Sequence, residues 1–329
     1  MLLPLYAPLI AILVTLILGR ILLSSNAGQK IQDVPNERSL HHQPIPRVGG
    51  VALIVGVLSS WAQMAQVIAW WLLLPLMMLF AFSLLDDIRG LSAGKRLLVH
   101  IAAAAMMVLG SGTEGHSVML GMMVLLGLVW MTNLFNFMDG ADGLAGGMAF
   151  FGFATYGVVL LHGDGMQAML NFSIAAAALG FLYYNFYPAR VFMGDAGSIP
   201  LGFLAAAMGV LGWQQGNWPL WFPVLVFSPF IMDASMTLVK RLLRGEIIWQ
   251  AHHGHYYQRL VRLGWGHKKT AIFYYGLMLS VAVSAIWLLE KPQAAQLVGL
   301  FIWCGIYAVL GLWVDHLWRM HEQIARPNR

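Results

Sequence analysis

The stretch that decides the fold runs from Val48 to Leu85 and reads VGGVALIVGVLSSWAQMAQVIAWWLLLPLMMLFAFSLL, without one charged residue. As a single helix at 1.5 Å per residue it would be about 57 Å long, roughly twice the thickness of a bilayer core. Its polar residues gather between Gln63 and Gln66, where side chains can reach the headgroups. The stretch therefore predicts two membrane-spanning helices, over 48–64 and 67–85.

The whole chain shares this character, with 59% hydrophobic and only 10% charged residues among 329. Soluble domains carry about 25% charged residues. The first apolar segment lacks a basic start and is too long for a signal peptide, so we expect it to be retained. The sequence predicts an all-α, polytopic integral membrane bundle of about eleven transmembrane helices, forming a single integral membrane domain over 1–329. The spans are 2–23, 48–64, 67–85, 97–110, 118–137, 144–161, 167–186, 198–213, 218–238, 271–289 and 294–314.

The basic residues predict the orientation of this bundle. With the N-terminus outside and the C-terminus in the cytoplasm, all of the 19 Lys and Arg residues except Lys291 lie on or beside the inner face. The positive-inside rule requires this asymmetry. No basic cluster stands apart from the membrane edges, which excludes nucleic acid as a partner. The single cysteine, Cys304, excludes a disulfide framework and a thiolate metal cluster.

The acidic residues are few, and five of the 14 fall in three tight motifs that the same topology places at the inner surface. These motifs contain Asp86-Asp87, Asp139 with Asp142, and Asp195. Carboxylates are costly near a bilayer and repel one another when clustered. A divalent cation relieves both problems, and oxygen ligands without cysteine favour Mg²⁺, with Mn²⁺ as the alternative.

Each motif also has a purely structural interpretation. Asp86-Asp87 is compatible with a solvated turn, and Asp139 and Asp142 with Asx turns. In the segment Gly194–Pro200, Ser198 is compatible with an N-cap of the next helix. Asn133, Asn136 and Asp139 recur every third residue, so they line one helix face for a ligand or hydrogen-bond to a neighbouring helix. Three such motifs on one face of a nearly uncharged protein favour function.

Two inner loops carry further candidates. The loop 240–269 contains His252, His253 and His255, for which we favour phosphate recognition together with Arg259. Metal ligation and an interfacial loop touching anionic lipids are the alternatives. The first inner loop combines Arg38 and Arg47 with prolines and the pair Gly49-Gly50. It predicts a loop that contacts phosphate or nucleotide, or else a simple basic linker.

These motifs, in this order, resemble the polyprenyl-phosphate N-acetylhexosamine-1-phosphate transferases, the family of MraY and WecA, over residues 33–260. The resemblance rests on the first inner loop, on Asp86-Asp87, on Asn136-Phe-Met-Asp139-Gly-Ala-Asp142-Gly, on Phe192-Met-Gly-Asp195-Ala-Gly-Ser198 and on the histidine loop. Eleven spans and a histidine run interrupted by Gly254 look closest to the O-antigen-initiating branch, and favour a simpler amino sugar than MurNAc-pentapeptide.

The resemblance implies a Mg²⁺-dependent transfer of N-acetylhexosamine-1-phosphate, or of its deoxy form, from a UDP-sugar to undecaprenyl phosphate, with release of UMP. It implies a bacterial inner membrane enzyme, working from the cytoplasmic face as a possible homodimer in lipopolysaccharide or cell-wall synthesis. Asp195 would be the principal metal ligand, with Asp87 beside it. Asp86 and Asp87 would be the catalytic pair next to the acceptor phosphate. Asn136, Asp139, Asp142 and Asn185 would line the nucleotide-sugar pocket, and Phe192 would stack on uracil.

Two other classes of membrane protein have different patterns. A CDP-alcohol phosphatidyltransferase carries Ala-Arg three residues after its first Asp, where this chain has Asp142-Gly143. A transporter would hold its ionisable residues near the midplane, often in inverted repeats. Release of UMP from a UDP-sugar in the presence of a lipid phosphate separates both classes from the transferase.

Overall fold

The computed structural model describes residues 4–25, 28, 30–33, 43–115, 117–247 and 253–325, with side chains to residue 323. The described chain is almost entirely helical. Its helices are α1 (Ala7–Ser24), α3 (Gly49–Trp61), α4 (Trp70–Arg89), α5 (Ala93–Gly110), α6 (Val118–Phe137), α7 (Leu144–Leu160), α8 (Gly165–Asn185), α9 (Asp195–Gln214), α10 (Trp221–Val226), α11 (Ser228–Leu243), α12 (Tyr256–Leu260), α13 (Gly266–Leu289) and α14 (Gln293–Ala325). Short 3₁₀ turns form η1 (Ala62–Val67) and η2 (Thr113–Gly115), and a π-helical turn forms η3 (Val261–Trp265).

The all-α membrane architecture is confirmed. Within the described residues, nine helices are long and apolar enough to cross a membrane, and α7 is a shorter apolar helix. The predicted break in the long apolar stretch is also confirmed, because η1 separates α3 from α4 and exposes Gln63 and Gln66. Several helix boundaries differ from the predicted spans. Helix α5 begins at Ala93 and includes Lys95 and Arg96, and α9 begins at Asp195. Ser198 is therefore not an N-cap, so that alternative was wrong.

The predicted single span 218–238 is wrong. The chain instead forms α10 and α11, with a break at Phe227 (φ −95°, ψ 9°). Pro229 lies one residue into α11 and has no N–H to donate to the carbonyl of Leu225, and its ring restricts Ser228 as well. Hydropathy reports an apolar segment of sufficient length but is blind to this loss of a backbone donor.

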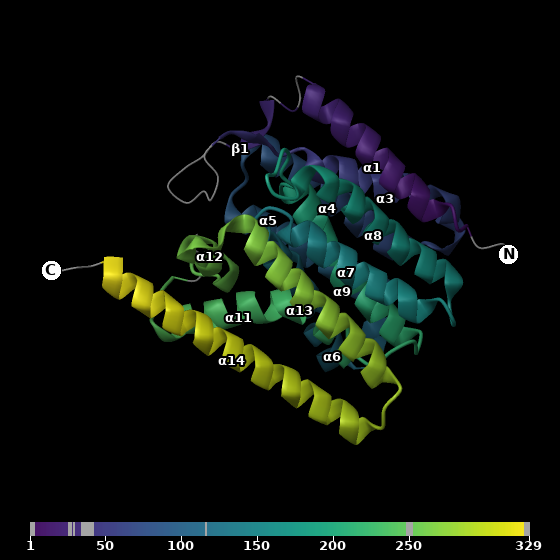
Figure 1. Ribbon diagram of the computed structural model, residues 1–329. Coiled ribbons are helices and arrows are strands. Elements are labelled where there is room, and N and C mark those ends of the chain that lie inside the picture. The colour runs from purple at the N-terminus through teal and green to yellow at the C-terminus, as the bar shows by residue number, and fades with distance from the viewer. Residues whose placement is uncertain are drawn as a thin grey trace.

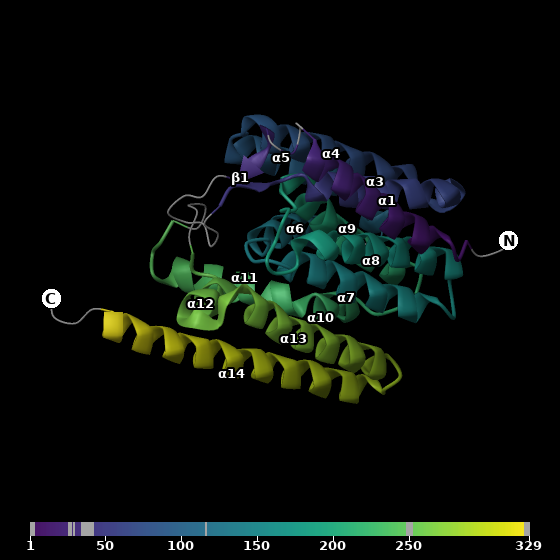
Figure 2. The same cartoon turned by 45° about the horizontal axis from the view of Figure 1, so that its top comes forward.

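The helices pack side by side, and the two termini lie at opposite ends of the bundle (Figure 1). Helix α8 packs on α1, α3 and α7, while α9 packs on α4 and α6. In both views α14 lies on the side of the bundle opposite α1 (Figures 1 and 2). The C-terminus, α12 and the small sheet lie at one end, and the N-terminus lies at the other (Figure 1). The sheet pairs β1 (Gln32–Asp33) with β2 (Ile45–Pro46) in antiparallel register, Gln32 opposite Pro46.

Candidate active site

The last turn of α4 and the first residue of α9 bring three of the predicted carboxylates together. Asp86 and Asp87 precede Gly90, whose positive φ of 69° ends α4. Asp195 opens α9 directly after Gly194, which also has a φ of 69°. We refer to Asp86, Asp87, Asp139 and Asp195 as the acidic cluster.

Asp87 joins the two helices by capping α9. Its Oδ1 accepts the N–H of Asp195 at 3.1 Å, and its Oδ2 accepts the N–H of Ala196 at 2.9 Å. These amides have no partner within their own helix, and a negative charge near a helix N-terminus is favourable. A Cβ at Gly194 would lie 2.8 Å from Asp87 Oδ2, so the close approach and the positive φ both require glycine.

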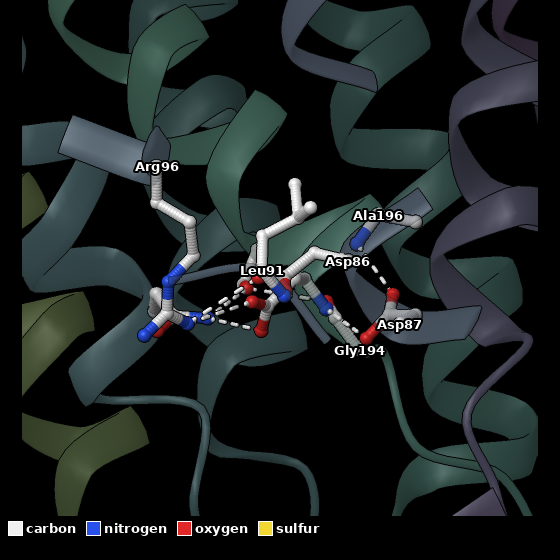
Figure 3. A network of polar contacts seen from close by, with 9 residues as sticks. Asp86, Asp87, Leu91, Arg96, Gly194 and Ala196 are labelled. Atoms are coloured by element: carbon white, nitrogen blue, oxygen red, sulfur yellow. Dashed lines mark hydrogen bonds and ion pairs between the residues drawn. The ribbon is translucent and has the colours of Figure 1, made fainter. Parts of the chain in front are cut away.

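Arg96 contacts the acidic cluster, and the sequence did not predict this contact. Its guanidinium lies 3.3 Å from Asp86 Oδ2 and 3.4 Å from Asp195 Oδ2. Figure 3 shows Arg96 reaching Asp86 from one side, while Asp87 lies on the other side beside Gly194 and Ala196. Asp86 also accepts the N–H of Leu91 just after its helix ends. The available signal was a cation in the segment that follows the Asp86-Asp87 pair.

Asn136 is the hydrogen-bond donor to the other carboxylate oxygen of Asp195. Its Nδ2 donates to Asp195 Oδ1 at 2.7 Å and to the Ser198 hydroxyl at 2.9 Å. Asn133, one turn earlier on α6, donates instead to the carbonyl of Val129 in its own helix and contacts His100 of α5. The structural interpretation therefore describes Asn133, while Asn136 faces the cluster.

Asp139 follows α6 and lies within electrostatic reach of the other members. Burial, and then the negative charges of Asp195 and Asp87, raise the pKa of the Asp139 carboxyl well above its ordinary value. The positive charge of Arg47 acts in the opposite direction. The cluster is thus short of positive charge at Asp139, which is the condition that a bound cation relieves.

The donor set fits a hard divalent cation. The Asp86 and Asp195 carboxylates face the same Arg96 guanidinium, at 3.3 and 3.4 Å, so their negative charges lie close together and a cation near them is favourable. Their donors are oxygens, as Mg²⁺ prefers. Within the described part of the chain, no three His, Cys, Asp or Glu side chains already surround one point as ligands. Binding a metal at Asp195 would therefore require this carboxylate to exchange its contact with Arg96 for the ion.

Asp142 and Asn185 lie beside the cluster and hold two loops together. Asp142 Oδ2 accepts the N–H of Ala189 at 3.0 Å, and its Oδ1 lies 3.1 Å from Nδ1 of His267. Asn185 is buried, accepts the N–H of Gly143 and donates to the carbonyl of Val191, each at 2.9 Å. His267, at the start of α13, was not predicted. These contacts fix loop 138–143 against loop 186–194, and nucleotide binding by Asp142 and Asn185 stays a prediction.

The first inner loop reaches the same place through its backbone. The N–H groups of Gly49 and Gly50 donate to the carbonyls of Phe192 and Met193 at 2.9 Å, and Phe192 N–H donates to the carbonyl of Pro46 at 2.8 Å. Gly50 is required because a Cβ would lie 2.3 Å from the Gly197 nitrogen. Arg47 pairs with Asp33 at 2.5 Å. Arg38 lies outside the described residues, so its predicted role is unaffected.

The histidine segment leads into α12. His255 is buried as the N-cap of α12, and its backbone N–H donates to Oε1 of Gln258 at 3.3 Å. His253 is half-buried, and His252 lies outside the described residues. Arg259, which we expected to contact phosphate, directs its guanidinium at Asp315 of α14, at 2.8 Å. Ligand binding by His252, His253 and His255 stays a prediction.

Known proteins resemble this chain over most of its length. Residues 69–212 match glycosyl transferase family 4. The chain is 30% identical to a phospho-N-acetylmuramoyl-pentapeptide-transferase of Moorella thermoacetica, over 85% of this chain and 96% of the relative. It is 29% identical to a probable undecaprenyl-phosphate N-acetylglucosaminyl 1-phosphate transferase of Bacillus subtilis, covering 77% and 76% of the two chains. It is 26% identical to a decaprenyl-phosphate N-acetylglucosaminephosphotransferase of Mycobacterium tuberculosis, covering 84% and 81%.

Proposed function

The chain belongs to glycosyl transferase family 4, the membrane enzymes that transfer a sugar phosphate to a polyprenyl phosphate, and on this premise we propose its particular reaction. It transfers an N-acetylhexosamine-1-phosphate, or a deoxy-N-acetylhexosamine-1-phosphate, from a UDP-sugar to undecaprenyl phosphate and releases UMP. The product lipid begins an O-antigen or another cell-envelope polysaccharide. The observation that carries the proposal is the acidic cluster, gathered from α4, loop 138–143 and α9 at one end of the bundle.

The residues of the cluster divide between the two substrates. Mg²⁺, held by Asp195 and Asp87, would neutralise the diphosphate charge that grows as the phosphoryl group transfers. A phosphate monoester has a second pKa near ~6, so the acceptor is already largely deprotonated at pH 7 and needs no strong base. Asp86 accepts hydrogen bonds from Leu91 and Arg96, which supports a role in orienting the acceptor rather than in taking a proton from it.

The nucleotide lies on the side of Phe192, Asp142 and Asn185 in this proposal. The backbone contacts of loop 186–194 with residues 46–50 give that side a fixed wall. An apolar cavity lies between α6, α9, α10 and α11 and supports the proposal of a lipid acceptor. Its volume is about 280 Å³, and Met131, Ala205 and Phe227 are among its lining residues. The break at Phe227 that interrupts the predicted span helps to form this cavity.

We assign the site to the cytoplasmic face of the bacterial inner membrane, where nucleotide sugars are available. Cysteine substitutions in a Cys304→Ala background test this orientation. Probes at Gly165 and Gln293 are expected to react with an impermeant maleimide on intact cells, and probes at Ser92 and Gly254 only after permeabilisation. Reaction at Gly254 from outside would overturn the assignment.

The reaction is tested with purified enzyme, undecaprenyl phosphate and a panel of UDP-sugars that includes GlcNAc, GalNAc and their 6-deoxy relatives. We expect UMP release that requires the lipid phosphate and Mg²⁺, with one sugar turned over fastest. A reaction without added lipid serves as the control for simple hydrolysis. Absence of UMP release with every sugar would remove the proposed reaction.

A further inference from the structure

Tyr257 on α12 reaches across the bundle to the loop that carries Asp139. Its hydroxyl donates to the carbonyl of Phe137 at 3.1 Å and accepts the N–H of Gly140. The ring and the hydroxyl are completely buried. A Cβ at Gly140 would lie only 2.2 Å from this hydroxyl oxygen, so the contact explains why residue 140 is glycine without a positive φ.

The position of Tyr257 is set by Asp233 of α11. The Asp233 side chain is 2% exposed. It accepts the backbone N–H of Tyr256 at 2.8 Å and that of Tyr257 at 2.9 Å. The hydroxyl of Tyr274 donates to the same carboxylate at 2.5 Å. Because an unpaired buried carboxylate is very costly, these contacts hold the start of α12 firmly against α11.

The histidine segment is attached to the same loop by a second contact. The ring of His255 stacks on that of Phe137, with centroids 6.2 Å apart, and on that of Tyr257, with centroids 5.9 Å apart. His255 and Tyr257 thus contact both ends of the Phe137–Gly140 turn. Any movement of α12 relative to α11 would move this turn, and Asp139 with it.

We propose that Tyr257, held in place by Asp233, is a positioning residue that fixes the Asp139 loop relative to the histidine segment and thereby sets the nucleotide-sugar pocket. The inference rests on the proposed function. Tyr257 is buried behind the loop and does not touch substrate. Its loss therefore loosens a binding wall without removing a reacting group, and the effect falls on KM for the UDP-sugar rather than on kcat.

Tyr257→Phe removes only the hydroxyl and leaves Gly140 N–H and the Phe137 carbonyl without it. We expect KM for the UDP-sugar to rise about tenfold, the upper end of what losing one hydrogen bond costs, with kcat within about twofold of wild type. Tyr307→Phe is the matched control, because it removes a buried hydroxyl that pairs with Ser228 rather than with the loop. Equal KM values for the two variants, or a fall confined to kcat, would overturn the proposed role.

A double-mutant cycle tests the contact without any turnover. Gly140→Ala is expected to lower the melting temperature sharply in wild type, where the new methyl meets the hydroxyl, and much less in Tyr257→Phe. There the nearest ring atom, Cζ, lies 3.2 Å from the new Cβ. Additive effects would show that the contact does not exist. A wild-type enzyme without transferase activity but with a non-additive cycle would disprove the proposed function and leave the contact standing.

Discussion

Two groups of carboxylates lie toward the same end of the bundle and are balanced in opposite ways. Asp233 and Asp315, which we call the paired carboxylates, each have a full set of donors. Asp233 accepts two backbone N–H groups and a tyrosine hydroxyl, and Asp315 pairs with Arg259 and Lys240. Among the described residues, Arg96 forms ion pairs with two of the four members of the acidic cluster, and these contacts are 3.3 and 3.4 Å long.

The difference separates carboxylates that stabilise the fold from carboxylates that we propose bind a ligand. A paired carboxylate repays its desolvation through its partners, and removing it leaves those partners unsatisfied. A clustered carboxylate is repelled by its neighbours, so removing one relieves repulsion while removing a member of the proposed metal and substrate site. The same substitution, Asp to Asn, is therefore expected to act on stability in one group and on activity in the other.

The largest effect is expected for Asp195→Asn, which keeps the size of the side chain and removes its charge. UMP release at saturating Mg²⁺ should fall by about 10²–10³-fold, the usual cost of losing one main stabiliser of developing charge. The melting temperature without metal should stay the same or rise. Retention of more than about a tenth of the wild-type rate would remove Asp195 from the metal site.

The next largest effect separates the roles of Asp86 and Asp142 within the site. Asp86→Asn should mainly lower kcat, because it alters the side chain beside the acceptor and Asp195. Asp142→Asn should raise KM for the UDP-sugar about ten- to a hundredfold, since one hydrogen bond to a charged group contributes about 1.5–3 kcal/mol. Calorimetric binding of UMP gives the readout. An equal loss of UMP affinity in both variants would erase the distinction between the two residues.

A smaller effect tests the paired carboxylates directly. Asp315→Asn leaves Lys240 and Arg259 without their shared anion and should destabilise the protein by about 1–3 kcal/mol. Turnover of the folded enzyme should change little, in contrast to Asp195→Asn. Thermal unfolding in detergent, measured beside UMP release, decides the matter. A variant that is fully stable but inactive would place Asp315 with the acidic cluster.

The smallest expected effect concerns Arg96. Because its guanidinium lies between Asp86 and Asp195, Arg96→Gln should strengthen Mn²⁺ binding in the absence of substrate. The gain should be up to about fivefold, since Arg96 is partly exposed and such pairs are weak. Lys95→Gln, a neutralised neighbour on the same helix, is the control. Weaker Mn²⁺ binding in Arg96→Gln alone would show that Arg96 supports the ion instead of competing with it.

The two groups also mark what the sequence could predict. Hydropathy located the membrane helices because lipid exposure demands long apolar segments, and it failed where Pro229 interrupts one of them. Asp86, Asp87 and Asp195 were identified because carboxylates are conspicuous in an apolar chain, and the structure brings them together. Their assignment as metal or substrate ligands remains a prediction.

The sequence held a signal for the structural role of Asp233. It is a lone carboxylate inside the predicted span 218–238, and such a residue needs a partner. Tyr257 carried no signal at all, because its hydroxyl meets a carbonyl 120 residues away in sequence. Contacts of this kind depend on how helices pack, which neither composition nor local spacing specifies.

The capping of α9 by Asp87 also has a consequence for biosynthesis. The Asp87 carboxylate and the Ala196 amide that it accepts are 109 residues apart. At ordinary elongation rates the ribosome needs about 5–20 s to make that length of chain. During this interval α4 must wait in the membrane with Asp86 and Asp87 facing water, since the helix that they will join has not been made. A nascent chain halted before Asp195 would lack the helix end that Asp87 caps, and the Asp87 carboxylate would keep water as its partner.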